Sequence, residues 1–239
     1  MQTYDVDYLC EGTHLRGYLA FDEKAAGRRP GVVVFHEGLG LGDFVIARSR
    51  RLAEHGYVAL AADMFGERRQ AKNLQEVANL VGGLRNEPET LRARGRAALA
   101  TLAALPQVDA GRMAAIGFCF GGSVALELAR DGADIKAVVS FHGVLSTRTP
   151  AVAGTVKASV LVLTGADDPL APPEQVRAFE EEMRMAEVRD WQVIAYGNTL
   201  HGFTNPAADG SMMRTALYNE QADRRSWAAM RSLFDEVFR

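Results

Sequence analysis

The chain has 239 residues, of which 48% are hydrophobic and 24% charged, and its formal net charge at pH 7 is -3. This balance gives no electrostatic reason to expect nucleic acid or an anionic membrane surface as a partner. Two cysteines are too few for a disulfide framework, and no apolar run reaches the roughly 18 residues of a membrane helix. The first residues, Met1–Leu9, lack the basic start and apolar core of a signal peptide. We therefore expect a cytoplasmic protein that folds as one domain over residues 1–239.

The predicted elements begin with a hairpin. Thr3–Leu9 and Thr13–Phe21 alternate apolar and polar residues and are joined by Glu11-Gly12, which is typical of antiparallel strands at a sheet edge. From Gly31 onward, continuous apolar runs alternate with segments of helical period. The expected buried strands are Val32–His36, Val58–Ala62, Arg112–Phe118, Ile135–Phe141, Val160–Thr164 and Trp191–Tyr196. The expected helices are Phe44–His55, Leu74–Leu84, Glu89–Leu105, Ser123–Arg130, Glu174–Ala186 and, last, Met213–Phe238.

This alternation of strands and helices predicts an α/β fold with a mostly parallel central sheet of about eight strands and helices on both faces. Ligands of such sheets bind outside the carboxyl ends of the strands. The segments that follow the predicted strands are therefore the places to search for a site.

One such segment, Gly117-Phe118-Cys119-Phe120-Gly121-Gly122, lies between a predicted strand and a predicted helix. It matches the G-x-S-x-G elbow of serine hydrolases, with cysteine in the nucleophile position. The turn is so sharp that side chains two residues before and two after the nucleophile would collide, which explains both glycines. The following helix N-terminus favours a thiolate. A buried structural cysteine is the alternative, but the place of Cys119 in the chain favours a nucleophile.

A candidate acid and a candidate base follow in the order that this elbow requires. Val160–Thr164 leads into Gly165-Ala166-Asp167-Asp168-Pro169, and the last predicted strand leads into Asn198-Thr199-Leu200-His201. A histidine there can act as the base for the sulfur, while an aspartate holds its other nitrogen. The alternatives are a solvated loop histidine and an aspartate pair that caps a turn or helix. All three residues in this order, each after a strand, favour the catalytic interpretation.

These residues resemble the dienelactone hydrolase family of the α/β-hydrolase superfamily, from about Gly31 to the C-terminal helix. The most specific likenesses are His36-Glu37, the Gly-Phe-Cys-Phe-Gly-Gly elbow, the Gly-x-x-Asp-x-x-x-Pro turn and His-Gly-Phe. The resemblance implies an α/β-hydrolase fold with Cys119 as nucleophile, His201 as base and Asp168, not Asp167, as its orienting acid.

The resemblance also implies an oxyanion hole and a thiol switch. The backbone N–H groups of Gly38 and Phe120 would form the oxyanion hole. The family's glutamate near the nucleophile falls on Glu37, whose charge disfavours a thiolate. The thiol would then stay protonated until substrate displaces the glutamate, which would protect it from oxidation. A surface glutamate in a glycine-rich loop is the alternative.

One part of the family pattern is missing. Family members that open dienelactone carry arginines that clamp the substrate carboxylate, one of them a few residues after the histidine. Here Gly-Phe-Thr-Asn-Pro follows His201, and Arg68, Arg69 and Lys72 do not align with a clamp. Without bidentate anchors an anionic substrate loses its main orienting contact. We therefore expect neutral esters to be better substrates than anionic lactones.

Together these features predict a cofactor-free and metal-free hydrolase of small carboxylic esters or lactones that acts through a thioester on Cys119. We also expect promiscuity toward other neutral activated esters, such as phosphotriesters. Nucleic acid and membrane are not expected as partners, and the oligomeric state is not indicated. The segment Met64–Arg94 is expected to roof the site. Two other functions stay open: an acyltransferase of the same fold, or a redox-sensing thiol protein without enzymatic activity.

Overall fold

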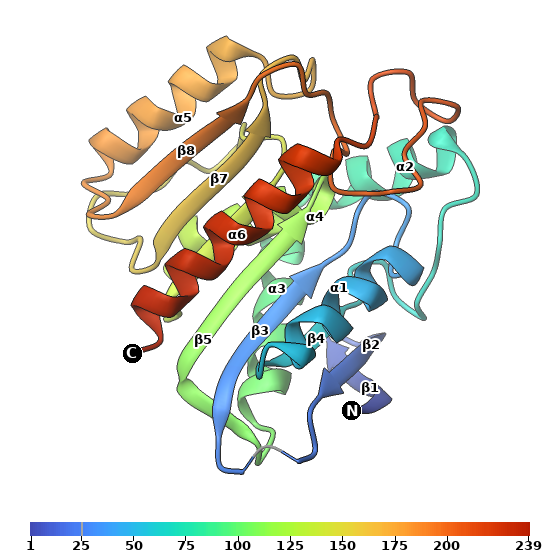
Figure 1. Ribbon diagram of the computed structural model, residues 1–239, viewed down its shortest axis with the longest axis vertical. Coiled ribbons are helices and arrows are strands. Elements are labelled where there is room, and N and C mark those ends of the chain that lie inside the picture. The colour runs from blue at the N-terminus through green and yellow to red at the C-terminus, as the bar shows by residue number, and fades with distance from the viewer. Residues whose placement is uncertain (25) are drawn as a thin grey trace. The chain divides into compact units, whose positions relative to one another are not determined.

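The computed structural model describes residues 1–24 and 26–239. Its backbone contacts group into two units, Met1–Ile116 and Gly117–Arg239. The strands follow the order β1-β2-β4-β3-β5-β6-β7-β8 (Figure 1). This arrangement confirms the predicted α/β fold with a mostly parallel sheet.

The first unit begins with the predicted hairpin. Strands β1 (Gln2–Cys10) and β2 (Thr13–Phe21) are antiparallel, with Cys10 opposite Thr13. Glu11 and Gly12 form the turn at φ 49° and 80°, a region that glycine adopts without strain. β2 also pairs antiparallel with β4 (Val58–Ala62), which runs parallel to β3 (Arg29–Phe35). The hairpin therefore lies at the edge of the sheet, as its alternating pattern predicts.

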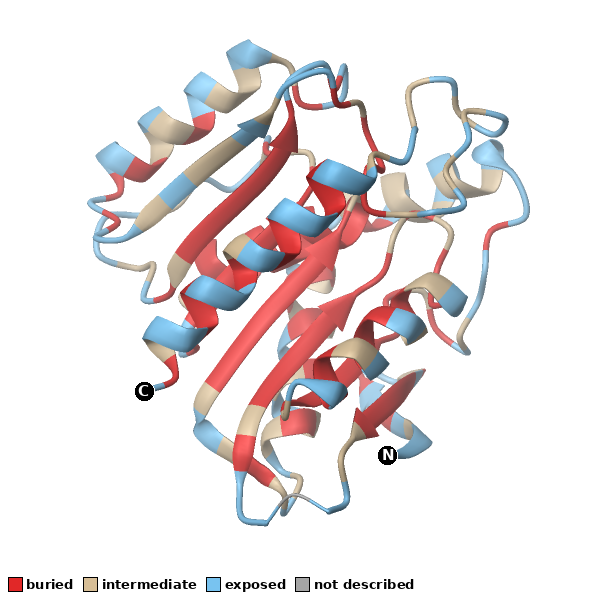
Figure 2. Ribbon diagram, viewed as in Figure 1, coloured by how far each residue is buried: buried red, intermediate tan, exposed pale blue. Residues whose placement is uncertain are grey.

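Burial in the first unit follows the sequence pattern. Every residue of β4 is buried, whereas β1 is exposed over most of its length (Figure 2). Helices α1 (Asp43–Glu54) and α3 (Pro88–Ala103) both contact β3 and β4 and lie on opposite faces in Figure 1. Helix α2 (Leu74–Asn86) packs against α3. A strand covered on both faces must be apolar throughout, and this requirement explains the sequence Val-Ala-Leu-Ala-Ala of β4.

The second unit is built in the same way. Strand β5 (Val108–Phe118) enters it and leads directly into α4 (Phe120–Arg130). Strands β6 (Ala137–Phe141), β7 (Ser159–Gly165) and β8 (Trp191–Tyr196) are parallel. Helices α4 and α6 (Glu220–Val237) both contact β6, and α5 (Pro173–Met185) connects β7 to β8. The predicted strands all form, although β5 begins at Val108 instead of Arg112.

The last predicted helix was wrong at its start: α6 begins at Glu220, not at Met213. Asn219 caps it, since its side-chain oxygen accepts a hydrogen bond from the backbone N–H of Ala222 at 3.1 Å. The residues that precede Asn219 form backbone hydrogen bonds with the loop of His201 instead. The N–H of His201 donates to the carbonyl of Thr215 at 2.9 Å, and the N–H of Leu217 donates to the carbonyl of His201 at 3.0 Å. These tertiary bonds replace the helical bonds that the apolar period predicts.

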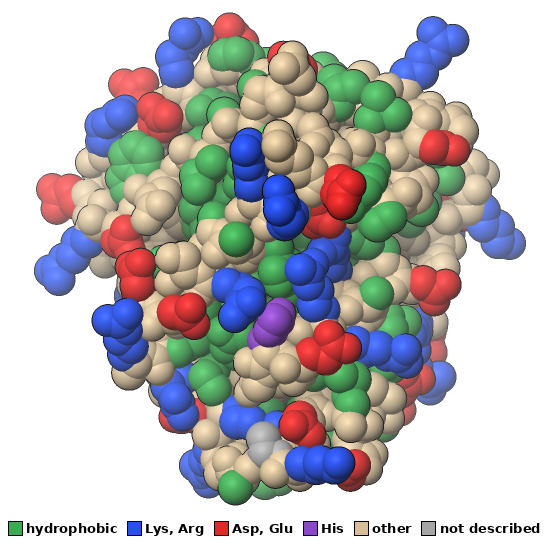
Figure 3. Space-filling model, in the orientation of Figure 1, with side chains coloured by type: hydrophobic (Ala, Val, Ile, Leu, Met, Phe, Trp, Pro, Cys, Tyr) green, Lys and Arg blue, Asp and Glu red, His purple; other side chains and the backbone are tan. Residues whose placement is uncertain are grey.

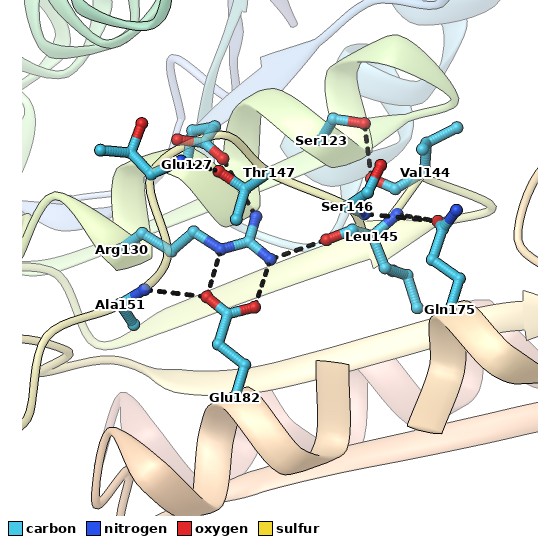
Figure 4. A network of polar contacts seen from close by, with 11 residues as sticks. Ser123, Glu127, Arg130, Val144, Leu145, Ser146, Thr147, Ala151, Gln175 and Glu182 are labelled. Atoms are coloured by element: carbon cyan, nitrogen blue, oxygen red, sulfur yellow. Dashed lines mark hydrogen bonds and ion pairs between the residues drawn. The ribbon is translucent and has the colours of Figure 1, made fainter. Parts of the chain in front are cut away.

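A buried ionic network ties α4 to the loop after β6 and to α5 (Figure 4). The guanidinium of Arg130, only 4% exposed, donates two hydrogen bonds to the carboxylate of Glu182 at 2.8 and 2.9 Å. It also donates to Glu127 at 3.1 Å and to the carbonyl of Leu145 at 2.7 Å. Each of its nitrogens thus has an acceptor, as a buried charge requires. The network fixes the loop that begins at His142 and Gly143.

The surface carries charges of both signs. Lys and Arg side chains are interspersed with Asp and Glu side chains over the visible face in Figure 3, as the small net charge requires. Among residues 1–24 and 26–239, no helix combines the length and apolar character needed to cross a lipid bilayer.

Candidate active site

Cys119 lies at the sharp turn between β5 and α4. Its backbone adopts φ 54° and ψ -115°, a conformation that is strained for a residue with a side chain. A Cβ atom added to Gly117 would lie 1.9 Å from the carbonyl oxygen of Gly121, so only glycine fits there. The steric requirement expected from the sequence is therefore met. The cysteine is partly exposed, whereas the neighbouring Phe118 and Phe120 are buried in the core.

His201 and Asp168 form a buried pair in the same unit. Nδ1 of His201 donates to Oδ2 of Asp168 at 2.8 Å, and each residue is only 2% exposed. The other carboxylate oxygen of Asp168 accepts the N–H of Leu170 at 2.8 Å. Asp167 is exposed on the outer side of this turn. Of the two adjacent aspartates, only Asp168 is hydrogen-bonded to the histidine.

The loops of Asp168 and His201 are held together by their backbones. The N–H of Ala166 donates to Tyr196 at 2.8 Å, and that of Asp167 donates to Thr199 at 3.1 Å. A Cβ atom on Gly165 would lie 2.3 Å from the carbonyl oxygen of Thr199. Glycine at this position thus permits a close approach of the two loops, which places the carboxylate against the imidazole.

The electrostatic environment of His201 favours its protonated form. Burial alone would lower the pKa of His201, but the charge of Cys119 and the hydrogen bond to Asp168 outweigh burial and raise it to about 10. The second ring nitrogen, Nε2, is buried, and a side-chain hydrogen bond between His201 and Cys119 also contributes to the raised pKa. A thiolate at Cys119 and an imidazolium at His201 therefore favour each other. This pairing is the state in which a cysteine nucleophile attacks.

His142 also contacts the nucleophile turn. It follows β6, is fully buried and has a positive φ of 40°. Its Nδ1 accepts the backbone N–H of Cys119 at 3.1 Å, and its Nε2 lies 2.8 Å from Oγ1 of Thr204. The ring packs edge to face against that of His201, with centroids 5.1 Å apart. The sequence motifs assign no catalytic role to His142 or Thr204, and only the position of His142 at the end of a buried strand indicates a place near the site.

His36, which follows β3 in the first unit, orients the peptide of the expected oxyanion donor. Nδ1 of His36 donates to the carbonyl of Glu37 at 2.7 Å, and Nε2 accepts the N–H of Met64 at 3.2 Å. Burial lowers the pKa of His36, which keeps the ring neutral and able to accept. The carbonyl of Glu37 also accepts the N–H of Gly40 at 3.1 Å. In a trans peptide, the N–H of Gly38 must then point the opposite way, away from His36.

Helix α2 packs against the same glycine. A Cβ atom on Gly38 would lie 2.8 Å from Cγ1 of Val77, so the helix approaches the backbone closely. The segment Met64–Arg94 thus covers the Gly38 loop within the first unit. Glu37, partly buried on this loop, and Gly38 keep their expected roles as predictions, as does Phe120 at the start of α4.

Of the three cations weighed as a carboxylate clamp, Arg68 is already engaged elsewhere. Its guanidinium lies 2.8 Å from Asp5 and stacks over the ring of Tyr18. Arg69 and Lys72 are exposed. Arg68 would have to give up its ion pair with Asp5 on β1 to anchor a substrate carboxylate.

Comparisons with known proteins agree with the family resemblance. The family model "Dienelactone hydrolase family" matches residues 15–238. A solved structure named m3DLH is 46% identical, with a TM-score of 0.94, and the match covers 99% of this chain and 98% of that one. The structure of a dienelactone hydrolase-like promiscuous phosphotriesterase from metagenomic libraries is 44% identical, with a TM-score of 0.93 and the same coverage. A Salmonella typhimurium protein whose name proposes carboxymethylenebutenolidase activity is 26% identical over 94% of this chain and 83% of its own length. The chain therefore belongs to the dienelactone hydrolase family.

Proposed function

We propose that this hydrolase cleaves small carboxylic esters or lactones through a thioester on Cys119. The observation that carries the proposal is the buried Asp168–His201 pair at 2.8 Å, whose imidazole pKa is raised by the charge of Cys119. A nucleophile, a base and an orienting acid in this relation are the components of acyl transfer. The family of the chain supports the substrate class.

In the first half-reaction the thiolate of Cys119 attacks the ester carbonyl and forms a tetrahedral oxyanion. The carbon–oxygen bond to the leaving group then breaks, and the imidazolium of His201 gives its proton to the departing alkoxide. The acyl group is left as a thioester on the sulfur. Asp168 holds Nδ1 throughout, so that Nε2 is the nitrogen that exchanges protons with the reactants.

The second half-reaction needs a neutral imidazole. Formation of the thioester removes the negative charge of Cys119, which is the largest of the effects that raise the pKa of His201. The pKa of His201 should fall as a result, because burial disfavours the imidazolium and only the interaction with Asp168 still stabilises it. Neutral His201 can take a proton from water, and the resulting hydroxide releases the carboxylic acid. The same ring thus serves as acid and then as base.

The oxyanion of both steps requires fixed donors. We assign this role to the backbone N–H groups of Phe120, at the N-terminus of α4, and of Gly38. Support comes from the peptide of Gly38, whose orientation is fixed by two hydrogen bonds to the carbonyl of Glu37. Removal of one such donor typically costs about 3 kcal/mol of transition-state stabilisation.

The decisive experiment is steady-state hydrolysis of an aryl acetate by Cys119→Ala, with Cys10→Ala as the matched control. We expect Cys119→Ala to abolish turnover, Cys119→Ser to be severely impaired and Cys10→Ala to retain activity. Mass spectrometry of quenched wild-type enzyme should show one acyl group on the peptide that contains Cys119. Activity of Cys119→Ala within tenfold of wild type would remove the cysteine from the mechanism.

A second activity is favoured by the structure that is 44% identical, a promiscuous phosphotriesterase. A thiolate can displace an aryl oxide from a neutral aryl dialkyl phosphate and form an S–P bond. Water activated by His201 would then cleave this bond, with the thiolate as leaving group. We expect repeated turnover of an aryl dialkyl phosphate, measured as phenol released per active site. A burst of one equivalent that then stops would show that the phosphotriester is an inhibitor.

Two other functions are separated by product analysis. An acyltransferase would pass the acyl group to an added alcohol or thiol in preference to water, which the ratio of products reports. A redox-sensing thiol protein would leave His201 and Asp168 without a role, and His201→Ala would then leave the reactivity of the thiol unchanged.

A further inference from the structure

We propose that His142 and Thr204 form a positioning pair that couples the nucleophile turn to the loop of the catalytic histidine. The proposal rests on the proposed function of Cys119 and His201. His142 is fully buried, and its two ring nitrogens reach these two segments of the second unit: Nδ1 reaches the backbone of Cys119, and Nε2 reaches Thr204, three residues after His201.

The hydrogen bonds determine the protonation state of the His142 ring. Nδ1 accepts the N–H of Cys119, so it carries no proton. The ring proton therefore lies on Nε2, which donates to the hydroxyl oxygen of Thr204 at 2.8 Å. The hydroxyl can accept this proton, so it satisfies the buried Nε2–H and holds the ring in place. Thr204 thus anchors the His142 ring in the state in which Nδ1 accepts the N–H of Cys119.

The contact with Cys119 has a mechanical consequence. The N–H of Cys119 is shared between the carbonyl of Phe141 at 3.0 Å and Nδ1 of His142 at 3.1 Å. Both acceptors hold the peptide group between Phe118 and Cys119, and Cys119 has the strained φ of 54°. His142 itself has a positive φ of 40°. The hydrogen bond from the N–H of Cys119 to Nδ1 of His142 therefore joins two residues with strained backbones. Loss of Nδ1 would let the turn relax and move the sulfur.

The same ring limits the position of the base. Its centroid lies 5.1 Å from that of His201 and 5.1 Å from that of Phe203, edge to face in both cases. Nucleophile and base therefore share one rigid neighbour. A displacement of about 1 Å in such an arrangement can reduce the rate about 10²-fold.

The test compares four variants in the full chain with an aryl acetate as substrate. His142→Leu fills the space without an acceptor, whereas the amide oxygen of His142→Asn can replace Nδ1. Thr204→Val removes the hydroxyl, and Thr204→Ser retains it. We expect His142→Leu to lower kcat about 10²-fold with KM within about threefold. His142→Asn should recover at least about tenfold of this loss, Thr204→Val should lower kcat about tenfold, and Thr204→Ser should be close to wild type.

Phe234→Leu, in the buried part of α6, controls for a general loss of packing, and thermal unfolding checks that each variant folds. The proposal is overturned if His142→Leu and His142→Asn are equally impaired, or if His142→Leu loses no more kcat than Phe234→Leu. If the His142 variants do not fold, the comparison of Thr204→Val with Thr204→Ser decides, and equal kcat values would overturn the proposal. A proposed function that is wrong is recognised separately, because Cys119→Ala would then remain active.

Discussion

The carboxylate of Asp168 accepts a hydrogen bond from Nδ1 of His201 at 2.8 Å, and both groups are almost completely withdrawn from solvent. The two residues are 33 positions apart, and their loops approach closely because Gly165 leaves room for the backbone of Thr199. A charged hydrogen bond in such surroundings is stronger than one at the surface. This pair fixes which ring nitrogen of His201 is available for chemistry.

The first prediction concerns the two adjacent aspartates. Asp168→Asn should lower kcat on the order of 10²–10⁴-fold, because an amide no longer holds the correct tautomer of the imidazole. Asp167→Asn is the matched control, since Asp167 is exposed, and its effect should be much smaller. Steady-state kinetics with an aryl acetate measures both. The reverse ranking would show that Asp167, not Asp168, orients His201 during catalysis.

The second prediction concerns the titration of His201. The pKa of His201 is about 10, and the charge of Cys119 is the largest of the effects that raise it. While Cys119 carries its negative charge, the imidazolium should therefore persist through neutral pH and be lost only as the pH rises toward 10. In Cys119→Ala the pKa of His201 should fall, whereas Cys10→Ala should leave it unchanged. NMR titration of labelled histidine measures this difference. Equal pKa values in wild type and Cys119→Ala would mean that Asp168 alone holds the proton.

The third prediction concerns the proposed thiol switch at Glu37. A carboxylate near the sulfur opposes its negative charge, so Glu37→Gln should speed alkylation by iodoacetamide and shift its pH profile to lower pH. The comparison is made in the absence of substrate. Glu54→Gln, an exposed glutamate of α1, serves as the control and should react as wild type. Superimposable profiles for Glu37→Gln and wild type would exclude the switch.

The fourth prediction concerns the charge of the substrate. Arg68 is paired with Asp5, and the sequence Gly-Phe-Thr-Asn-Pro that follows His201 contains no arginine. A neutral aryl acetate should therefore have a higher kcat/KM than a carboxylate-bearing dienelactone. If the dienelactone is clearly preferred, Arg68, Arg69 or another cation must bind its carboxylate, and Arg68→Gln, Arg69→Gln and Lys72→Gln would show whether one of these three supplies it.

The fifth prediction concerns the buried network around Arg130. Arg130→Met should lower the free energy of unfolding by about 3–5 kcal/mol, because the buried carboxylate of Glu127 and the partly buried carboxylate of Glu182 lose their partner. Arg177→Met is the control: its pair with Glu174 is exposed, and the loss should be at most about 1 kcal/mol. Urea unfolding measures both. A loss for Arg130→Met no larger than that of the control would contradict the importance of the network.

The same network predicts a pH dependence. Burial raises the pKa of Glu182, but the hydrogen bond and charge of Arg130 outweigh burial and lower it from the ordinary value of 4.5. A group with a lowered pKa stabilises the fold above its ordinary value and loses this contribution as the pH falls through the lowered one. The stability difference between wild type and Arg130→Met should therefore shrink below about pH 4.5.

The sequence by itself determined the fold class and the nucleophile turn. Strands covered on both faces must be apolar throughout, so an apolar run such as Val58–Ala62 predicts a buried strand without reference to any other part of the chain. The glycines around Cys119 are also a local steric signature, because a Cβ atom on Gly117 would collide with the backbone of Gly121 in the same turn. Features whose cause lies within a few residues are readable from those residues.

The tertiary structure alone decided what depends on distant partners. The period of Met213–Asn219 is helical, but its backbone bonds to the loop of His201, so α6 begins only at Glu220. The family resemblance favours Asp168 over Asp167, but only the approach of two loops explains the choice, because it brings the Asp168 carboxylate against His201. His142 and Thr204 meet from positions 62 residues apart. No local pattern records such contacts, because the free energy that fixes them arises only when the remote segments pack together.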